Sequence, residues 1–183
     1  MNHKPPRVVM EAADLQKTLY RMANEIVQQA EERSQLVLIG IHTGGVHLAK
    51  RLQSIIAEVY RLNLPVGMLD ITLYRDDWTR LHTQPVVRAT DLPFRIDDQE
   101  VVLIDDVLFT GRTIRAALDA LIDYGRPKRV QVAVLVDRGH RELPICGQFI
   151  GINQKTLVQE QVNVHLVETD GYDRVVVEVP CPA

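Results

Sequence analysis

Long hydrophobic runs are absent from this 183-residue sequence. No stretch approaches the about 18 consecutive apolar residues that a membrane-spanning helix requires. The segment from Met1 to Pro6 contains no apolar core of the kind that a secretory signal peptide carries. We therefore expect a cytoplasmic protein that has no contact with a membrane.

Cysteine is scarce, and an excess of basic residues is missing. Cys146 and Cys181 form neither a C-x-x-C pair nor a set with metal-ligand spacing, so we expect free thiols without a role in the site. The 21 Lys and Arg residues against 24 Asp and Glu residues give a net charge of −3. A protein that coats nucleic acid along its whole surface is therefore excluded, and any RNA binding must use a local patch.

Two common phosphate-binding motifs are missing as well. The sequence contains neither G-x-x-x-x-G-K-[ST], typical of P-loop nucleotide hydrolases, nor G-x-G-x-x-G, typical of dinucleotide-binding folds. It does contain 46% apolar residues, which is enough for a chain of this length to bury a full core. We expect residues 1–183 to form a single domain.

The most informative segment is a buried strand that is followed by two aspartates, a tight turn and a helix. Four apolar residues from Val101 to Ile104 predict a strand that is covered on both faces. Asp105 and Asp106 are then expected at the tip of this strand. Apolar side chains with helical spacing follow the turn at Ile114, Ala117, Leu118, Leu121 and Ile122.

The turn Thr110-Gly111-Arg112-Thr113 has the composition of an anion cradle. Main-chain N–H groups at a helix start have no partners within the helix, and Gly111 is expected to let the backbone approach an anion closely. The two carboxylates repel phosphate, but they can accept hydrogen bonds from hydroxyl groups or help to hold a hydrated Mg²⁺. A ribose with a phosphate and a metal-bound diphosphate satisfies both halves. The competing interpretation is an ordinary turn in which Asp106 and Thr110 are caps.

A second strand, loop and helix come earlier in the chain. Residues 36–41 predict a buried strand, which the loop His42-Thr43-Gly44-Gly45 follows. The next helix presents one apolar side, formed by Leu48, Leu52, Ile55, Ile56 and Val59. A first amphipathic helix is marked by Leu15, Leu19, Met22 and Ile26, and further strands are expected at 66–73 and 130–136. This order predicts an α/β fold with a mostly parallel open sheet flanked by helices, which binds its ligands at the carboxyl ends of the strands.

Two regions do not fit this alternation. The polar stretch of about 74–98 contains Trp78, Pro85 and Pro93, and we interpret it as a mobile flap. Near the C-terminus, residues 163–167 and 175–179 are expected to form edge strands.

The segment that starts at Val101 resembles the 5-phosphoribosyl 1-pyrophosphate (PRPP) motif of type I phosphoribosyltransferases. The PRPP run comprises Val101, Val102, Leu103, Ile104, Asp105, Asp106, Val107, Leu108, Phe109, Thr110, Gly111, Arg112 and Thr113. Three further segments narrow the resemblance to the bacterial regulators of pyrimidine operons within that family: Asp70 to Asp77, Asp119 to Pro127 and Ala133 to Ile145. The resemblance covers nearly the whole chain.

This resemblance implies a type I phosphoribosyltransferase fold with a small flap or hood, and two activities. One is uracil phosphoribosyltransferase activity, which converts uracil and PRPP to UMP and pyrophosphate with Mg²⁺ as the cofactor. The other is the binding of UMP or UTP together with the leader of pyrimidine operon mRNA, which attenuates transcription. A homo-oligomer is also implied. Asp105 and Asp106 would be catalytic at the ribose and would hold the metal, directly or through water.

By the same resemblance, Thr43-Gly44-Gly45 is the pyrophosphate loop. Members of this group usually carry an arginine where this sequence has Gly44, so one positive charge for pyrophosphate is missing and the efficiency of catalysis stays open. Arg75 is our first choice of a catalytic residue that supplies this charge, with Arg80 and Arg88 in the flap as alternatives. The competing interpretation of Arg75 is a solvated loop charge.

Phe109 and Arg138 are the residues that the resemblance places at uracil. Purine-specific members of the family have an aspartate immediately before the Thr-Gly pair, whereas Phe109 can stack on a base but cannot accept a proton. This difference favours uracil over hypoxanthine or guanine. Arg138 would contact the base or close over it, unless it forms a salt bridge with Asp137 or Glu142.

Candidates for RNA contact are Lys17, Arg21 and Arg141. Lys17 and Arg21 share a face of the first helix, but attenuating relatives often carry further basic residues where this sequence has Asn24 and Gln29. Whether RNA binding is retained therefore stays open. Two other hypotheses also remain: a nucleotide sensor with little catalysis, and a phosphoribosyltransferase for another small base.

Overall fold

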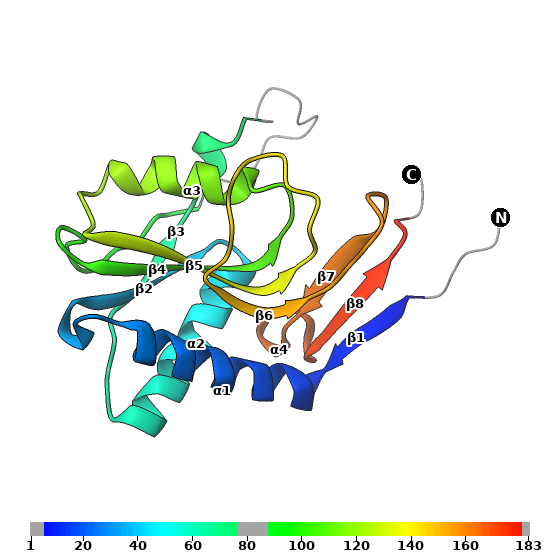
Figure 1. Cartoon of the computed structure of the whole chain (residues 1–183), viewed down its shortest axis with the longest axis horizontal. Helices are drawn as coiled ribbons and strands as arrows, with labels where there is room; N and C mark the ends of the chain where they lie inside the picture. Colours follow the sequence, from blue (N-terminus) through cyan, green and yellow to red (C-terminus); the bar gives the residue numbers. More distant parts are fainter. Residues whose placement is uncertain (1–5, 77–87, 181–183) are drawn as a thin grey trace.

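The computed structural model describes residues 6–76 and 88–180. Within these residues the chain forms two sheets (Figure 1). The larger sheet has five parallel strands in the order β3-β2-β4-β5-β6. The smaller sheet has three antiparallel strands in the order β1-β8-β7.

The bounds of the elements are as follows. The parallel sheet contains β2 (Leu36–Ile41), β3 (Val66–Leu69), β4 (Glu100–Leu108), β5 (Arg129–Asp137) and β6 (Phe149–Asn153). The small sheet contains β1 (Arg7–Glu11), β7 (Gln161–His165) and β8 (Arg174–Glu178). The helices are α1 (Ala12–Gln29), α2 (Gly44–Tyr60), α3 (Arg112–Ile122) and α4 (Val167–Asp170), with the 3-10 turns η1 (Arg33–Gln35) and η2 (Thr72–Tyr74).

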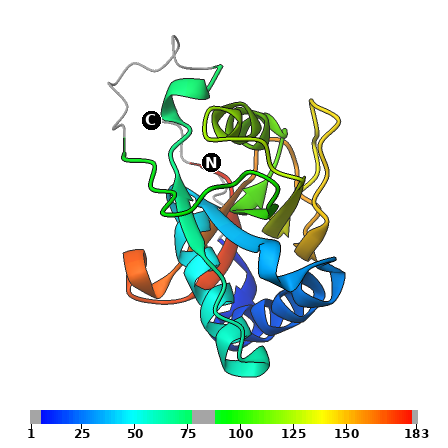
Figure 2. The ribbon, with the colours of Figure 1, turned by 90° about the vertical axis from the view of Figure 1, so that its left-hand side faces the viewer.

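Helices cover both faces of the parallel sheet. Helices α1 and α2 lie against one face and α3 lies against the other (Figure 1 and Figure 2). Leu15 and Leu52 belong to the core cluster on the first face, and Ile114 and Leu121 belong to the cluster on the second. Each such buried side chain stabilises the fold by about 1.5–3 kcal/mol. Strands β2 and β4 are buried along most of their length, as their continuous apolar runs predict.

The connections leave β2 and β4 in opposite directions. Helix α2 leads from β2 to β3 at one edge of the sheet, whereas α3 leads from β4 to β5 on the other side. Strands β2 and β4 are neighbours, so the loops that follow them diverge at one point. In open α/β sheets such a topological switch point forms a crevice in which ligands bind.

The predicted fold class, a parallel α/β sheet flanked by helices, is confirmed. The predicted strand at 36–41 and the predicted helices are present. Gly125, three residues after the end of α3, has a φ of +145°. No helix of the described residues has both the length and the apolar content to cross a membrane.

The position predicted for the acidic pair was wrong in one respect. Strand β4 continues to Leu108, so Asp105 and Asp106 lie inside the strand instead of at its tip. The reason is that β5 pairs with β4 as far as Leu108, opposite Asp137, while the pairing with β2 ends at Ile104. The two aspartates therefore lie on the part of β4 that extends beyond β2.

Three other predictions about the elements were also wrong. Strand β8 is the central strand of the small sheet and not an edge strand, because β1 pairs along its other side. The strand expected at 66–73 ends at Leu69, and η2 follows. Val59 and Ile122 are 48% and 71% exposed because both lie in the last turns of their helices.

Part of the predicted flap is described. Its returning segment pairs with β3, where the main-chain N–H and O of Met68 bond to those of Asp91 in both directions at 2.8 Å. Trp78, Arg80 and Pro85 lie outside the described residues.

Candidate active site

Two consecutive carboxylates lie on β4 beyond the end of its pairing with β2. Asp105 is 6% exposed, and its Oδ1 accepts the main-chain N–H of Asp106 at 3.0 Å. The Oδ1 of Asp106 accepts the main-chain N–H of Val107 at 2.8 Å. Burial, and then the charge of Asp106, raise the pKa of Asp105 well above its usual range. A carboxyl group in this environment favours ligands that bring hydrogen-bond donors or positive charge.

The predicted pyrophosphate loop lies against this acidic pair. Helix α2 begins at Gly44 with Thr43 as its N-cap. A Cβ on Gly45 would lie 2.2 Å from the main-chain O of Ile104, so glycine lets the start of α2 lie directly on β4. A Cβ on Gly44 would lie 2.6 Å from Oδ2 of Asp106. The first turn of a helix, which offers main-chain N–H groups to an anion, thus borders the carboxylates.

The Thr110 to Thr113 turn forms the second loop of the crevice. Helix α3 begins at Arg112, and its N-cap Gly111 has a φ of +91°. A Cβ on Gly111 would also lie 3.3 Å from Cβ of Ile145. The backbone conformation and the packing against Ile145 therefore require glycine at this position, in addition to the close approach to an anion that the sequence predicts.

A cavity of about 300 Å³ brings the PRPP run together with Arg75. Its lining residues are Arg75, Asp76, Val107, Leu108, Phe109, Thr110, Arg112 and Thr113. The guanidinium of Arg112, one of these lining residues, donates to Asp76 at 2.5 Å and to Glu142 at 2.7 Å. Arg112 therefore links three segments of the chain: the start of the flap, the start of α3 and the loop after β5.

Arg138 packs against Phe109. Its guanidinium carbon lies 4.0 Å from the centroid of the Phe109 ring, and the residue is 6% exposed. Its Nε donates to Oγ1 of Thr156 at 3.1 Å, and an Nη donates to the main-chain O of Leu157 at 3.0 Å. Burial lowers the pKa of Arg138. Arg138 therefore supports the ring that was predicted to stack on the base, and fixes the segment after β6.

Arg141 stabilises the loop after β5. It forms an ion pair with Asp137 and donates to the main-chain O of Phe109 at 2.6 Å and of Ile145 at 2.9 Å. Among the described residues, Asp137 thus pairs with Arg141 and Glu142 with Arg112, so the salt bridge considered for Arg138 is not formed. These contacts place Arg141 in a structural role and do not favour it as an RNA contact.

The described part of the flap reaches the pyrophosphate loop through Arg88. The guanidinium of Arg88 donates to Oγ1 of Thr43, and its main-chain N–H donates to Oδ2 of Asp70. Asp70 was not singled out from the sequence. The available signal was its place at the carboxyl end of a strand next to β2, where polar residues of parallel sheets meet.

The described residues contain no cluster of three or more His, Cys, Asp or Glu side chains that could hold a metal ion. The acidic pair offers two carboxylates. A hydrated Mg²⁺ needs few protein ligands when a substrate phosphate completes its coordination, so this pair fits a metal that arrives with a diphosphate.

The two candidates for RNA contact on α1 differ in their surroundings. Lys17 is exposed. Arg21 donates to the main-chain O of Ile150 at 3.0 Å and of Gly151 at 2.5 Å, and it forms an ion pair with Glu25. Arg21 therefore also fixes α1 to β6.

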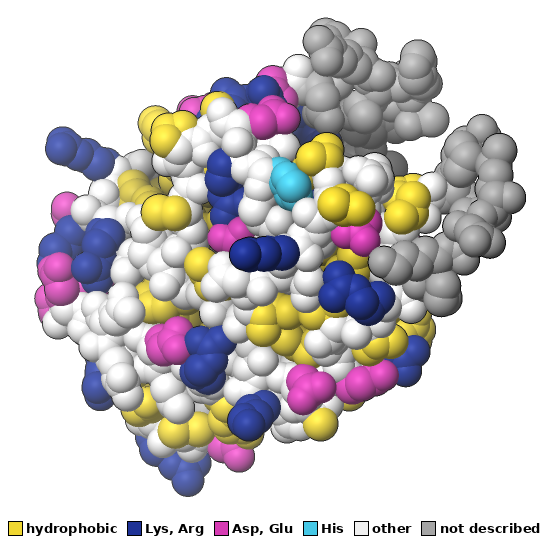
Figure 3. Space-filling model, turned by 45° about the vertical axis from the view of Figure 1, so that its right-hand side comes forward, with side chains coloured by type: hydrophobic (Ala, Val, Ile, Leu, Met, Phe, Trp, Pro, Cys, Tyr) yellow, Lys and Arg dark blue, Asp and Glu magenta, His cyan; other side chains and the backbone are white. Residues whose placement is uncertain are grey.

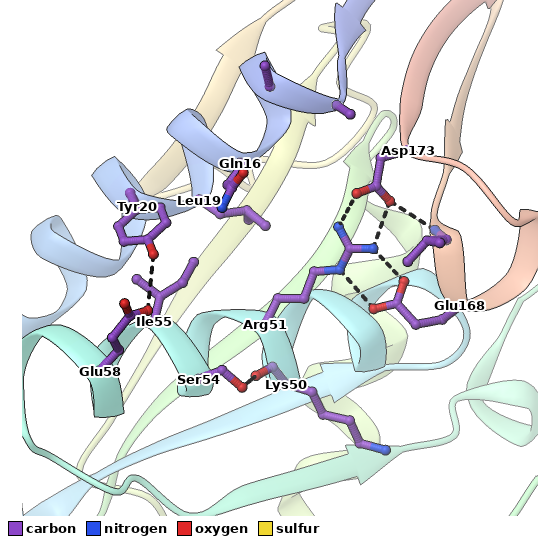
Figure 4. A pocket seen from close by; sticks show the side chains of 13 residues that line it. Gln16, Leu19, Tyr20, Lys50, Arg51, Ser54, Ile55, Glu58, Glu168 and Asp173 are labelled. Atoms are coloured by element: carbon purple, nitrogen blue, oxygen red, sulfur yellow. Dashed lines mark hydrogen bonds and ion pairs between the residues drawn. The ribbon is translucent and has the colours of Figure 1, made fainter.

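A groove of about 720 Å³ between α1, α2 and the α4–β8 segment shares no lining residue with the site (Figure 4). Its main polar groups pair with each other. The hydroxyl of Tyr20 donates to Glu58 at 3.1 Å, and Arg51 forms ion pairs with Glu168 at 2.5 Å and Asp173 at 2.7 Å. These pairs link α1 to α2, and α2 to the segment that connects β7 to β8 in the small sheet.

Comparison with known proteins identifies the class. Residues 11–165 match the family model described as a phosphoribosyl transferase domain. A hypoxanthine-guanine phosphoribosyltransferase from Bacillus anthracis has a TM-score of 0.70 at 16% identity, over 98% of this chain and 100% of that chain. The hypoxanthine phosphoribosyltransferase of Trypanosoma cruzi has a TM-score of 0.72 at 16% identity, over 95% and 97%. Family model and fold define a type I phosphoribosyltransferase domain.

More similar relatives narrow this class. The "Bifunctional protein PyrR" of Syntrophobacter fumaroxidans is 72% identical over 172 residues, which are 94% of this chain and 92% of the relative. The protein of the same name from Thermus thermophilus is 54% identical over 167 residues, which are 91% and 92% of the two chains. The chain belongs to the PyrR family of phosphoribosyltransferases.

Proposed function

We propose that this chain transfers the 5-phosphoribosyl group of PRPP to uracil, which gives UMP and pyrophosphate. The observation that carries this proposal is the meeting of an acidic pair with two helix starts at the switch point between β2 and β4. The first turn of α3 would bind the 5′-phosphate of the ribose, and the first turn of α2 would bind the diphosphate. Both subsites would lie beside the same two carboxylates.

The reaction is a displacement at the anomeric carbon, in which a nitrogen of uracil attacks and pyrophosphate leaves. Positive charge grows on the ribose ring in the transition state, and the carboxylates of Asp105 and Asp106 stabilise that charge while accepting hydrogen bonds from the ribose hydroxyls. Phe109 stacks on the base, and Arg138 holds the ring of Phe109 in place. Alignment of the two reactants is worth up to about 7–11 kcal/mol.

Mg²⁺ fits the acidic pair because of its two neighbouring carboxylates. The glycine at position 44 also keeps a side chain away from Oδ2 of Asp106, from which a Cβ would lie 2.6 Å. Hard cations prefer carboxylate and phosphate oxygens, so Asp105 and Asp106 would hold the ion directly or through water. When bound, it would take up negative charge of the leaving diphosphate.

We also propose that UMP or UTP in this site promotes binding to the leader of pyrimidine operon mRNA and attenuates transcription, in a homo-oligomer. The exposed Lys17 and the neighbouring Arg21 on α1 support a local contact surface. Figure 3 shows basic and acidic side chains interspersed on the face that it presents, which fits a small patch better than a broad basic surface. A sensor without catalysis is the second candidate, since it would use the same nucleotide site.

A substrate competition assay tests the enzymatic proposal. With Mg²⁺ and PRPP, the purified chain should consume uracil and leave hypoxanthine and guanine unchanged, because Phe109 offers a stacking surface but no proton acceptor. The measurement is the formation of labelled nucleotide from each base, with an Asp119→Asn variant on the exposed side of α3 as a control. Comparable turnover of a purine would contradict the base assignment. Absence of turnover with any base, while PRPP and UMP still bind, would favour the sensor.

A further inference from the structure

We propose that Arg88, positioned by Asp70, supplies the positive charge for pyrophosphate that Gly44 does not carry. The inference rests on the proposed phosphoribosyl transfer and deepens it. It assigns the diphosphate subsite to two segments: the start of α2, and the chain that returns from the flap.

The first observation is the contact between Arg88 and the pyrophosphate loop. The guanidinium of Arg88 donates from Nη1 to Oγ1 of Thr43, and Thr43 is the N-cap of α2. The cation thus lies at a helix start, where main-chain N–H groups and the helix dipole already favour an anion. A guanidinium carries five N–H donors in a planar fork that matches phosphate oxygens.

The second observation is the way in which Asp70 holds the main chain of Arg88. Oδ1 of Asp70 accepts the main-chain N–H of Thr72 at 2.8 Å and its hydroxyl at 2.5 Å, while Oδ2 accepts the N–H of Arg88. The main-chain N–H of Asp70 also donates to Oγ1 of Thr90 at 3.0 Å. One buried side chain therefore joins the chain that leaves β3 to the chain that returns.

The charge state of Asp70 agrees with this role. Asp70 is 8% exposed, and burial alone would favour its neutral form. The hydrogen bonds from Thr72 and Arg88 outweigh the burial and keep the pKa of Asp70 below its usual value. As a carboxylate, Asp70 accepts hydrogen bonds at both oxygens and donates none, so it is a fixed acceptor for the main-chain N–H of Arg88.

The third observation explains why the charge comes from the flap and not from the loop. A Cβ on Gly44 would lie 2.6 Å from Oδ2 and 2.9 Å from Cγ of Asp106. Any larger side chain at position 44 would therefore require Asp106 to move. A cation that approaches from the returning segment leaves Asp106 where it is.

Arg75 and Arg88 then have different places at the site. Arg75 lines the cavity formed by the PRPP run, next to Phe109 and Thr110. Arg88 contacts the pyrophosphate loop. Between these two arginines, the geometry assigns the diphosphate to Arg88, whereas the sequence favoured Arg75.

Ligand binding measured by isothermal titration calorimetry tests the inference, with Mg²⁺-pyrophosphate, PRPP and UMP as separate probes. Arg88→Ala should weaken the binding of pyrophosphate and PRPP about 10- to 100-fold, because one charge-assisted contact is lost, and should leave UMP unchanged. Arg88→Lys should restore part of the loss, since it restores the charge without the planar fork. Arg95→Ala removes an exposed arginine of the same segment and should change none of the three affinities.

Asp70→Asn tests the positioning role. This variant should also weaken pyrophosphate binding, but by a smaller factor than Arg88→Ala does. It should add little in the Arg88→Ala background, because both changes remove the same contact between Arg88 and pyrophosphate. Asp91→Asn, an exposed acid on the same returning segment, is the matched control. Thermal melting shows that each variant is folded.

The outcomes separate the two proposals. A wild-type chain that binds neither PRPP nor UMP overturns the proposed function and this inference with it. A wild-type chain that binds both, with Arg88→Ala losing UMP as strongly as pyrophosphate or losing neither, overturns the inference alone. Additive losses in the double variant overturn the role of Asp70.

Discussion

Asp105 has opposite effects on folding and on the proposed chemistry. Its carboxyl group is buried beside another carboxylate, and both factors raise its pKa. A raised carboxyl pKa means that the folded state is most stable while the group is protonated, and that stability is lost as pH rises from the ordinary value of 3.8 through the raised one. The fold therefore retains a group whose ionisation destabilises it, as expected for a functional carboxylate.

The variant Asp105→Asn should separate the two effects. Asparagine keeps an oxygen for the N–H of Asp106 and brings no charge, so the Tm of the variant relative to that of wild type should increase as pH rises from 4 to 8. A gain of about 1 kcal/mol corresponds to about 2–4 °C for a chain of this size. Phosphoribosyl transfer should fall by at least ~100-fold. Melting curves across this pH range, with Asp119→Asn as the exposed control, check the sign; a Tm difference independent of pH would contradict it.

At the residue scale, the candidate groups of the site could be read from the sequence more easily than their partners. The pair Asp105 and Asp106, the Gly44 loop and Phe109 could be proposed because each lies in or directly after a segment with a recognisable strand pattern. The partner of Arg138 could not, because the contact with Phe109 depends on how the loop after β5 folds back on β4. The contact between Asp70 and Arg88 could not be predicted for a similar reason, because it joins two residues that are 18 positions apart in the sequence.

At the element scale, the start of α2 depends on two neighbouring glycines with different contacts. The nearest atoms to a Cβ on Gly45 belong to the main chain of β4, whereas the nearest to a Cβ on Gly44 belong to the side chain of Asp106. A main chain within a sheet cannot yield, but a side chain can rotate. Gly44 therefore serves the site, and Gly45 serves the packing of α2 on the sheet.

The pair Gly44→Ala and Gly45→Ala tests this division. Gly45→Ala should lower stability by about 1–3 kcal/mol or more, because it overpacks the contact with Ile104. Gly44→Ala should change Tm less and lower kcat/KM for PRPP more, because it displaces Asp106. Circular dichroism melts and initial rates on both variants give the comparison. Equal losses of Tm would contradict the assignment.

Elements with continuous apolar runs, such as β2 and β4, could be predicted because burial on both faces leaves a direct pattern in the sequence. Strands β1 and β6 were missed. Strand β1 is mostly exposed and gains its partner, β8, from the other end of the chain, so no local pattern marks it. Strand β6 contains Gly151, a weak strand former, at a point where a Cβ would lie 2.3 Å from the main-chain O of Leu135.

At the scale of the whole molecule, a net charge of −3 limits RNA binding to a small surface. Lys17→Ala should weaken binding to the pyrimidine operon leader in the presence of UMP, and should reduce the salt slope by about one unit if Lys17 contacts a phosphate. Lys50→Ala, an exposed lysine on α2, is the matched control. Binding measured at several salt concentrations gives the slope. Wild-type affinity for the leader no higher than for an unrelated hairpin would contradict the regulatory proposal.

Strand β6 joins the two surfaces that the proposed regulation uses. Arg21 of α1 donates to the main-chain O of Ile150 and Gly151, and the segment that follows β6 holds Arg138 against Phe109. If a nucleotide bound at Phe109 raises the affinity of α1 for RNA by some factor, thermodynamic reciprocity requires that bound RNA raises the affinity for the nucleotide by the same factor. The leader is then an effector as well as a target: a chain on its mRNA will retain UMP at concentrations at which the free chain releases it.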